Sequence, residues 1–290
     1  MPLAARSPFV TRKIEEDIMP ELPEVETVVR GLQPLSGLQV TEVTLFDGAK
    51  HVYDTEQIVG ETLMEVRRYG KYLLFHFSSD LVMISHLRMT GQYVIAANKG
   101  EKEKVFHKHS HVLFSFSDGR FLLFNDQRRF GTIEVLSASA VPSYFSSRKL
   151  GPDALLELPD FETFERLLKR KKNMPIKTTL LDQSVLMGLG NIYAQELCFL
   201  AGVHPATPSC KVPESSLRLI HKSIVPLLEK AIEFNGTTFD GKYVNTNGDS
   251  GAFSAFLSVY GQKVCKSCSH DTVKIKLNGR GTYYCPSCQK

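Results

Sequence analysis

The stretch Met19-Pro20-Glu21-Leu22-Pro23-Glu24-Val25-Glu26 brings two prolines and three acidic residues together near the start of the chain. Proline and acidic side chains are favoured in the first turn of a helix, so the stretch predicts a short helix over residues 23–34 that ends near Gly31. A proline that directly follows a methionine becomes a secondary amine, and therefore a nucleophile, once the methionine is removed. The carboxylates of Glu21 and Glu24 adjoin that nitrogen in sequence and can assist a covalent attack as acids.

Residues 1–18 precede this stretch, and while they remain attached the nitrogen of Pro20 is an amide without a nucleophilic lone pair. They contain no apolar segment, no secretion signal and no clear amphipathic period. Glu15-Glu16 is encoded by a purine run shortly upstream of the Met19 codon, where a bacterial ribosome-binding sequence would fall. We therefore expect translation to begin at Met19, and residues 1–19 to be a non-native or disordered extension.

Cys265, Cys268, Cys285 and Cys288 form two Cys-x2-Cys pairs separated by 16 residues. This spacing is typical of two thiolate knuckles that close on one tetrahedral Zn²⁺. The alternative is a pair of disulfides. The sequence disfavours it, because neither a signal peptide nor a long apolar run directs the chain to an oxidising compartment. A reducing cytosol is the better expectation.

Length and charge favour a multidomain protein with a polyanionic partner. A chain of 290 residues exceeds the usual size of a single core. Residues 256–290 contain six Lys or Arg against one acid, and residues 166–177 contain six Lys or Arg and no acid. Two basic segments in one chain favour nucleic acid as a partner, although either alone is usually a solvated face. Cys198 and Cys210 are expected to be packed free thiols.

The first half of the chain has strand character. Six segments rich in β-branched and aromatic residues predict strands at residues 40–46, 71–77, 81–87, 111–116, 121–124 and 132–136. Ser117-Asp118-Gly119-Arg120 is a hairpin turn signal between two of them. With the leading helix, these strands predict an antiparallel two-layer β-sandwich.

After Leu150-Gly151-Pro152 the pattern becomes helical. Helices are predicted at residues 161–172, 176–181, 192–201 and 215–234. Residues 236–254 are rich in Gly, Asn, Thr and Ser and predict a mobile loop that closes over a ligand. The chain is therefore expected to be an α+β multidomain protein with a sandwich, a helical domain and a four-cysteine zinc ribbon.

Several motifs occur in a characteristic order between residues 19 and 290. They are the stretch 19–27, Gly70-Lys71-Tyr72-Leu73-Leu74, His86-Leu87-Arg88-Met89-Thr90-Gly91, Lys108-His109-Ser110-His111, Asp126-Gln127-Arg128-Arg129-Phe130-Gly131, Leu180-Leu181-Asp182-Gln183, Gly188-Leu189-Gly190-Asn191-Ile192-Tyr193-Ala194 and the cysteine ribbon. Together they resemble the bacterial formamidopyrimidine-DNA glycosylases.

The resemblance implies a catalytic β-sandwich over residues 20–150, a helix-two-turns-helix DNA-binding domain with a lesion loop over 151–255 and a zinc-finger ribbon over 256–290. It implies a base excision repair enzyme that removes 8-oxoguanine and formamidopyrimidines from damaged double-stranded DNA. The same enzyme would cut the strand as an abasic-site lyase, by β,δ-elimination. The resemblance further implies one structural Zn²⁺, a monomer, no membrane association and a place in the cytoplasm at the nucleoid.

By the same resemblance, five residues carry the chemistry. Pro20 is the nucleophile that forms an iminium with the sugar, Glu21 protonates the sugar oxygen and Glu24 is a supporting carboxylate. Lys71 contacts a phosphate beside the lesion, although a lysine in a strand is more often simply exposed. Arg280 clamps the phosphates that flank the lesion.

Other residues are expected to hold the DNA after the damaged nucleotide has left the stack. Phe130 resembles the wedge and Met89 the plug that fill the gap, and Arg128 resembles the residue that hydrogen-bonds the orphaned cytosine. Because a Met and a Phe near strand ends are usually core residues, these roles rest on the resemblance.

Four further residues are expected at the DNA backbone. His109 and Asn191 resemble phosphate contacts, and Lys172 and Asn173 occupy a DNA-contacting segment. For His109 the alternative is a metal site with its neighbours His107 and His111, which the lack of nearby carboxylates disfavours.

Two departures from the family pattern and two alternative functions stay open. The approach to the ribbon, residues 259–265, is shortened and carries Gln262 where relatives have Arg, and Ala252 stands where many relatives have an aromatic residue. An endonuclease VIII type enzyme, which removes oxidised pyrimidines on the same scaffold, is the first alternative. The second is a catalytically silent DNA-binding protein, which would follow if Pro20 is not exposed.

Overall fold

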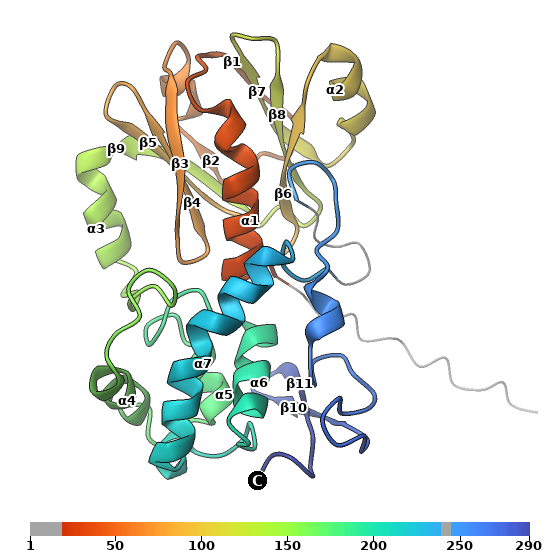
Figure 1. Cartoon of the computed structure of the whole chain (residues 1–290). Helices are drawn as coiled ribbons and strands as arrows, with labels where there is room; N and C mark the ends of the chain where they lie inside the picture. Colours follow the sequence, from red (N-terminus) through yellow and green to blue (C-terminus); the bar gives the residue numbers. More distant parts are fainter. Residues whose placement is uncertain (1–18, 239–244) are drawn as a thin grey trace, which may run out of the picture.

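The computed structural model describes residues 19–238 and 245–290. The expected extension therefore lies, except for Met19, outside the described residues. Figure 1 shows a β-rich part at the top and a helical part below it, with helix α1 (Leu22–Leu32) running from one toward the other. The C-terminal hairpin lies beside the helical part, so the expected α+β organisation is confirmed.

Two sheets form the β-rich part. The four-stranded sheet has the order β1-β7-β8-β6, and the five-stranded sheet has the order β2-β9-β5-β4-β3. Their bounds are β1 (Val40–Leu45), β2 (Val52–Tyr53), β3 (Leu63–Tyr69), β4 (Tyr72–Phe77), β5 (Leu81–His86), β6 (Gly91–Ala96), β7 (Ser110–Phe116), β8 (Phe121–Asp126) and β9 (Thr132–Ser137). All pairs are antiparallel except β2 with β9, which is parallel.

The six predicted strands are all present, but β2, β3 and β6 were missed. Strand β3 contains the charged run Glu65-Val66-Arg67-Arg68, which the sequence did not predict as a strand. A strand with one buried face is expected to turn apolar side chains inward, but in β3 the buried face includes Arg68. Helix α1 ends at Leu32, which confirms the predicted end near Gly31. Gly31 is also a close-approach position, since a Cβ there would lie 2.1 Å from Thr246 Oγ1.

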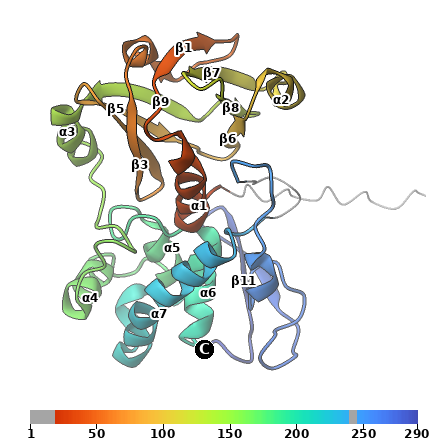
Figure 2. The same ribbon diagram turned by 45° about the horizontal axis from the view of Figure 1, so that its top comes forward.

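Two short helices attach to the sandwich, α2 (Lys99–Val105) and α3 (Val141–Ser146). Figure 2 shows α3 at the edge of the sandwich, from which the chain descends to the helical part. That part consists of α4 (Phe161–Lys169), α5 (Ile176–Leu181), α6 (Asn191–Leu200) and α7 (Glu214–Glu233) around a core of its own. Within the described ranges, every helix is too short or too polar to serve as a transmembrane span.

The helical part differs from the sequence prediction at its basic segment. Helix α4 ends at Lys169, and Lys172 turns the chain with a φ of 36°. Lys177 is fully buried and its Nζ donates to Thr282 Oγ1 at 3.1 Å. Lys177 therefore joins α5 to the C-terminal hairpin and is not part of a surface patch.

The C-terminal hairpin consists of β10 (Val273–Leu277) and β11 (Arg280–Tyr284). It packs against α6, where Gln195 accepts from the Tyr283 amide at 2.5 Å and donates to the Gly281 carbonyl at 3.3 Å. Of the two other cysteines, Cys198 is buried as expected, whereas Cys210 is exposed, because it sits in a short surface turn rather than in the apolar helix.

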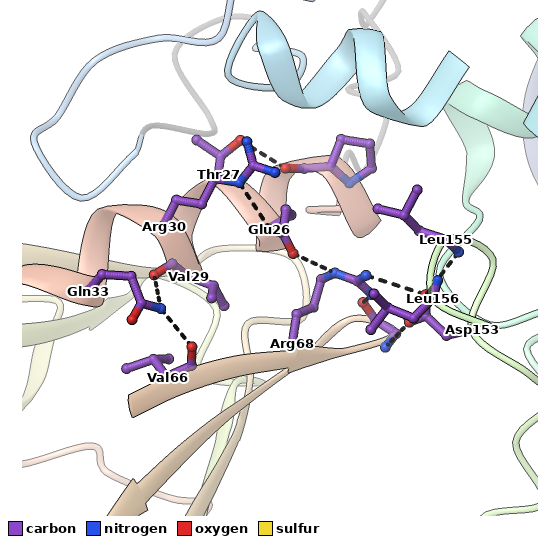
Figure 3. A network of polar contacts seen from close by, with 12 residues as sticks. Glu26, Thr27, Val29, Arg30, Gln33, Val66, Arg68, Asp153, Leu155 and Leu156 are labelled. Carbon is purple, nitrogen blue, oxygen red and sulfur yellow. Dashed lines mark hydrogen bonds and ion pairs between the residues drawn. The ribbon is translucent and has the colours of Figure 1, made fainter. Parts of the chain in front are cut away.

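A buried polar network joins the sandwich to the helical part (Figure 3). Arg68 Nη1 donates to Asp153 Oδ2 at 2.5 Å, and its Nε donates to Glu26 Oε2 at 3.0 Å. Asp153 Oδ2 also accepts from the Gly70 amide at 2.7 Å. Burial alone would raise the pKa of Asp153, but the hydrogen bond and charge of Arg68 hold that pKa below its usual value. The network thus depends on an ionised pair from which water is excluded.

We predict that Asp153→Ala lowers the free energy of unfolding by at least about 2 kcal/mol, because it leaves one face of a buried guanidinium without its partner. Chemical denaturation of the parent and the variant measures the loss. Glu65→Ala is the matched control, since it breaks the exposed Arg67–Glu65 pair and should change stability by about 1 kcal/mol or less. Equal losses for the two variants would contradict a structural role of the network.

Candidate active site

The N-terminus of α1 is held by its own carboxylates. Glu21 is the N-cap, and its amide donates to Glu24 Oε2 at 2.9 Å. Glu24 Oε1 accepts from the Tyr193 hydroxyl at 2.6 Å and from the Thr237 amide at 2.7 Å. Pro20 immediately precedes this capped turn and is buried. The stretch that opened the sequence analysis is therefore both a helix start and the wall of a buried polar site.

The side chain of Glu21 reaches the N-terminus of α6. Its Oε1 accepts from the Ile192 amide at 2.8 Å, so the carboxyl lies at the positive end of that helix. Gly190, the N-cap of α6, leaves room for it, since a Cβ there would lie 2.2 Å from Glu21 Cδ. Gly190 of the Gly-Leu-Gly-Asn motif is thus required by the close approach of the Glu21 carboxyl.

Lys71 faces this carboxyl from the turn between β3 and β4. The prediction placed Lys71 inside a strand, but β4 begins at Tyr72 and Lys71 follows Gly70, whose φ is +59°. Lys71 is only 4% exposed. Burial lowers its pKa, the charge of Glu21 raises it, and the charge of Arg280 lowers it. A buried lysine whose pKa is lowered releases its proton more readily than an exposed lysine does, which suits it to proton transfer.

The pKa of Glu21 is raised to about 7. Burial is the largest cause, the Lys71 charge opposes it, and the Glu24 charge adds to it. Burial also raises the pKa of Glu24, against the hydrogen bonds from Tyr193 and Thr237. A carboxyl with a pKa near neutrality can donate a proton under physiological conditions.

A cavity of about 360 Å³ opens between the sandwich, the helical part and the C-terminal hairpin. Its lining includes Met19, Glu21, Lys71, His86, Asn191 and Arg280. Four of the five expected catalytic residues are therefore at or next to one cavity, with Pro20 between Met19 and Glu21. The fifth, Glu24, lies behind Glu21 and holds its backbone.

Sequence reasoning missed His86 and Tyr260, which also line the cavity. His86 Nδ1 accepts from the Arg88 amide at 3.0 Å, so its proton is on Nε2. Burial, with the charges of Arg88 and Lys71, lowers the pKa of His86 to about 3, which keeps the ring neutral. The available signal was the position of His86 in the same motif as Met89.

Asn191 and Arg280 bring α6 and the C-terminal hairpin to the cavity. Asn191 Nδ2 donates to the Gly281 carbonyl at 3.2 Å, and its buried Oδ1 has no hydrogen-bond partner among the described residues. Arg280 is exposed at the start of β11. The amide of Asn191 therefore has its orientation set by the hairpin that carries Arg280.

Met89, Arg128 and Phe130 form a separate group that does not line this cavity. Arg128 lies 5.3 Å from the Phe130 ring centroid, and Phe130 is 51% exposed. The Arg128 amide donates to Thr90 Oγ1 at 2.9 Å, which ties the loop after β8 to the turn that carries Met89. The three side chains expected to fill a gap in DNA thus share one rim of the sandwich.

The remaining expected DNA contacts lie away from the cavity. The His109 ring is 5.7 Å from that of His107, while His111 is buried and its Nε2 is 2.8 Å from the Asp126 carbonyl oxygen. These imidazoles do not converge on a metal position. Lys172 and Asn173 are exposed in the turn between α4 and α5.

The expected mobile loop is only partly described, because residues 239–244 lie outside the described ranges. Its flanks are hydrogen-bonded. The Thr246 carbonyl accepts from the Ile95 amide at 3.1 Å, and the Gly251 amide donates to Thr238 Oγ1 at 2.7 Å. Ala252 is bonded to the end of α7 through the Phe234 carbonyl. The mobility of the loop stays a prediction.

The four ribbon cysteines do converge. One sulfur each from Cys265, Cys268, Cys285 and Cys288 lies within 4.8 Å of the others, and no pair is at disulfide distance. The Sγ–Sγ distances are 3.9 Å for Cys265–Cys288 and 3.4 Å for Cys268–Cys285. Tetrahedral Zn²⁺ with bonds of about 2.3 Å separates sulfurs by about 3.8 Å, so the cluster fits this ion.

Comparison with known proteins agrees with this organisation. Three family models match in order: the formamidopyrimidine-DNA glycosylase N-terminal domain at residues 19–133, the formamidopyrimidine-DNA glycosylase H2TH domain at 150–242, and the zinc finger found in FPG and IleRS at 262–290. The formamidopyrimidine-DNA glycosylase of Streptococcus thermophilus is 39% identical over 279 residues, which cover 94% of this chain and 100% of that protein. The enzyme of Streptococcus pneumoniae is 40% identical over 280 residues, which cover 94% and 99%.

Solved structures of Lactococcus lactis Fpg with DNA have the same fold. A complex with DNA that contains an abasic site has a TM-score of 0.84 at 36% identity, covering 93% of this chain and 100% of that one. A complex with N7-benzyl-Fapy-dG DNA has the same score and coverage. The matched domains meet at the cavity where Glu21 faces Lys71, and on this evidence the chain belongs to the formamidopyrimidine-DNA glycosylase family of DNA repair enzymes.

Proposed function

We propose that this protein removes oxidised purines, 8-oxoguanine and formamidopyrimidines, from duplex DNA and then cuts the strand at the abasic sugar. The observation that carries the proposal is the buried Glu21 carboxyl, whose pKa is raised to about 7 beside the nitrogen of Pro20 and opposite Lys71. An acid adjacent to a potential amine nucleophile, in a cavity lined with cations, suits attack on a sugar flanked by phosphates.

In the proposed reaction the Pro20 amine attacks C1′ of the damaged nucleotide. The new C1′–N bond replaces the bond to the base, which leaves with the bonding electron pair and takes up the proton that the attacking amine loses. Glu21 donates its proton to the ring oxygen, so the sugar opens as an iminium. Loss of a proton from C2′ then expels the 3′ phosphate, and a further proton loss from C4′ expels the 5′ phosphate.

The hydrogen bonds of the site support these roles. Glu24 accepts from the Glu21 amide, the Tyr193 hydroxyl and the Thr237 amide, so it acts as a rigid support rather than a second acid. Lys71, Arg280 and Asn191 line the cavity and are proposed to bind the phosphates beside the lesion. The Arg88 amide donates to His86 Nδ1, which leaves the ring proton on Nε2. The neutral ring can therefore donate a hydrogen bond from Nε2.

We propose that the rim of the sandwich that carries Met89, Arg128 and Phe130 recognises the rest of the duplex. The exposed Phe130 is the wedge, Met89 the plug and Arg128 the donor to the unpaired cytosine. His109, Lys172 and Asn173 contact backbone phosphates of the same duplex. We also propose that the chain forms three domains, at residues 20–150, 151–255 and 256–290. The protein is proposed to be a monomer in the bacterial cytoplasm, associated with the nucleoid.

A second candidate substrate class is oxidised pyrimidines. Lactococcus lactis Fpg, 37% identical to this chain, has been crystallised with DNA that contains an oxidised pyrimidine. The cavity would have to accept the smaller base with the same sugar chemistry. Relative excision rates for 8-oxoguanine opposite cytosine and for thymine glycol decide between the two classes.

The test of the nucleophile is borohydride trapping on a duplex with 8-oxoguanine opposite cytosine. We predict one covalent adduct, at Pro20, and an intact mass for a chain that begins at Pro20, since only a free amine forms the reducible iminium. Met19→Leu, expressed from the Met1 codon, is the matched control, because it prevents a start at codon 19 and so keeps residues 1–19 attached to Pro20. The control should bind DNA without being trapped.

An adduct at Pro2 or at a lysine in a protein that retains residues 1–19 would refute this assignment. No adduct and no strand cleavage by a protein that binds the duplex would favour the silent DNA-binding alternative.

The pKa of Glu21 predicts the pH dependence. The carboxyl is protonated below about 7 and loses its proton above it, whereas an α-amine becomes nucleophilic as pH rises toward about 8. Single-turnover excision should therefore rise and then fall with pH, with a maximum between about 7 and 8. In Glu21→Gln the falling limb should vanish along with most of the rate. A parent rate that still increases at about pH 9 would exclude Glu21 as the acid.

We also propose that the four cysteines hold one structural Zn²⁺, which would stabilise a ribbon too small to fold by its own core. Removal of zinc by chelation, or Cys268→Ala, should lower affinity for lesion DNA at least about tenfold, because Arg280 and the Gly281 contact to Asn191 depend on the hairpin. Cys210→Ala is the control and should bind normally, since that thiol is exposed and is not one of the four clustered cysteines. Full affinity in metal-free protein would contradict the proposal.

A further inference from the structure

Two arginines with no role in the proposed chemistry line the active-site cavity. Arg88 follows β5 and Arg148 follows α3, so they reach the cavity from two separate elements of the sandwich side. Both also line a neighbouring cavity of about 150 Å³, together with Tyr72 and Tyr144. The two guanidiniums therefore occupy the junction between the active site and a second, smaller hollow.

Arg88 adopts a backbone conformation that arginine rarely takes. Its φ is +53°, in the left-handed region that glycine prefers. Its amide donates to His86, but any residue has an amide, so this bond does not explain an arginine. The residue with this strained backbone carries a cationic side chain that lines the cavity, which makes that side chain a candidate for binding a ligand there.

Arg148 is held in place before any ligand arrives. Its guanidinium carbon is 3.4 Å from the Tyr144 ring centroid, and its Nη1 donates to the Tyr144 carbonyl at 2.6 Å. Tyr144 in turn contacts Tyr72 edge-on, with ring centroids 6.3 Å apart. Stacking orients the planar fork of donors and reduces the entropy lost on binding.

The charges around the two arginines favour an anion. In the described part of the chain neither Arg88 nor Arg148 takes part in an ion pair. Glu134 lines the smaller cavity as well, yet it pairs with neither. Lys71 and Arg280 add positive charge across the larger cavity. An anion with several oxygen acceptors would satisfy both forks.

We propose that Arg88 and Arg148 form a second phosphate subsite, which binds one backbone phosphodiester of the lesion-bearing strand. This phosphate is the neighbour of those that face Lys71, His86 and Arg280. The ligand class is a phosphodiester within a polymer, because the subsite opens onto the cavity where the damaged sugar is processed. The inference rests on the proposed function and adds to it two positioning residues on the sandwich side.

The protein side of the test uses Arg88→Gly combined with Arg148→Ala. Glycine relieves the strain at a positive φ, so Arg88→Gly should not lower the melting temperature. Lys149→Gly is a matched control, since Lys149 also has a positive φ of 51° and lines neither cavity. Binding is measured to a duplex with one abasic-site analogue between about 50 and 200 mM salt.

We expect the double variant to lose about 10- to 100-fold in affinity at the lowest salt. The slope of its log affinity against log salt concentration should decrease by the amount expected for about one phosphate contact. The control should stay within about twofold of the parent. A double variant that matches the parent in affinity and salt dependence would overturn the proposal.

The DNA side of the test locates the contact. Each phosphate near the lesion is replaced in turn by a neutral methylphosphonate. One position should weaken the parent and leave the double variant unchanged, which general destabilisation of the protein would not produce. If every replacement weakens both proteins equally, the subsite does not exist. A parent that does not distinguish lesion DNA from intact DNA instead overturns the proposed function, and this subsite with it.

Discussion

The buried ion pair between Arg68 and Asp153 is the contact on which the arrangement of the two halves depends. Arg68 belongs to the sandwich and Asp153 to the start of the helical part, and Asp153 also binds the amide of Gly70. Separating them would leave charges without partners in a medium of low dielectric. Because Lys71 follows Gly70 directly, the same contact sets the position of the lysine that faces Glu21.

A second set of contacts completes the site from the other direction. Glu21 caps α6 through the Ile192 amide, and Glu24 binds Tyr193 and Thr237. Backbone amides, rather than cations, satisfy most of these carboxyl oxygens, so burial still raises the pKa of both groups. Burial where the start of α1 meets α6 thus raises the pKa of Glu21, against the hydrogen bonds from the Ile192 and Tyr193 amides that lower it. Chemistry and domain assembly depend on the same hydrogen bonds.

Several elements were predictable from local sequence because local forces determine them. The Cys-x2-Cys spacing brings sulfurs to one point whatever surrounds them, and the hairpin between β7 and β8 follows from Ser117-Asp118-Gly119-Arg120. Strand β3 was missed because its inward Arg68 contradicts the usual alternation. Lys177 was misread as a surface cation, since a partner distant in sequence, Thr282, decides its burial.

The sequence by itself determined the order of the β-rich, helical and four-cysteine parts and the residue types available for chemistry, because spacing and side-chain identity carry that information. Only the tertiary structure decided that Lys71 is buried, that His86 is neutral and that Glu21 has a pKa of about 7. It also decided that Arg88 and Arg148 meet at one cavity wall. These properties arise from desolvation and from charges that approach across domain boundaries, and a pattern of neighbouring residues contains neither.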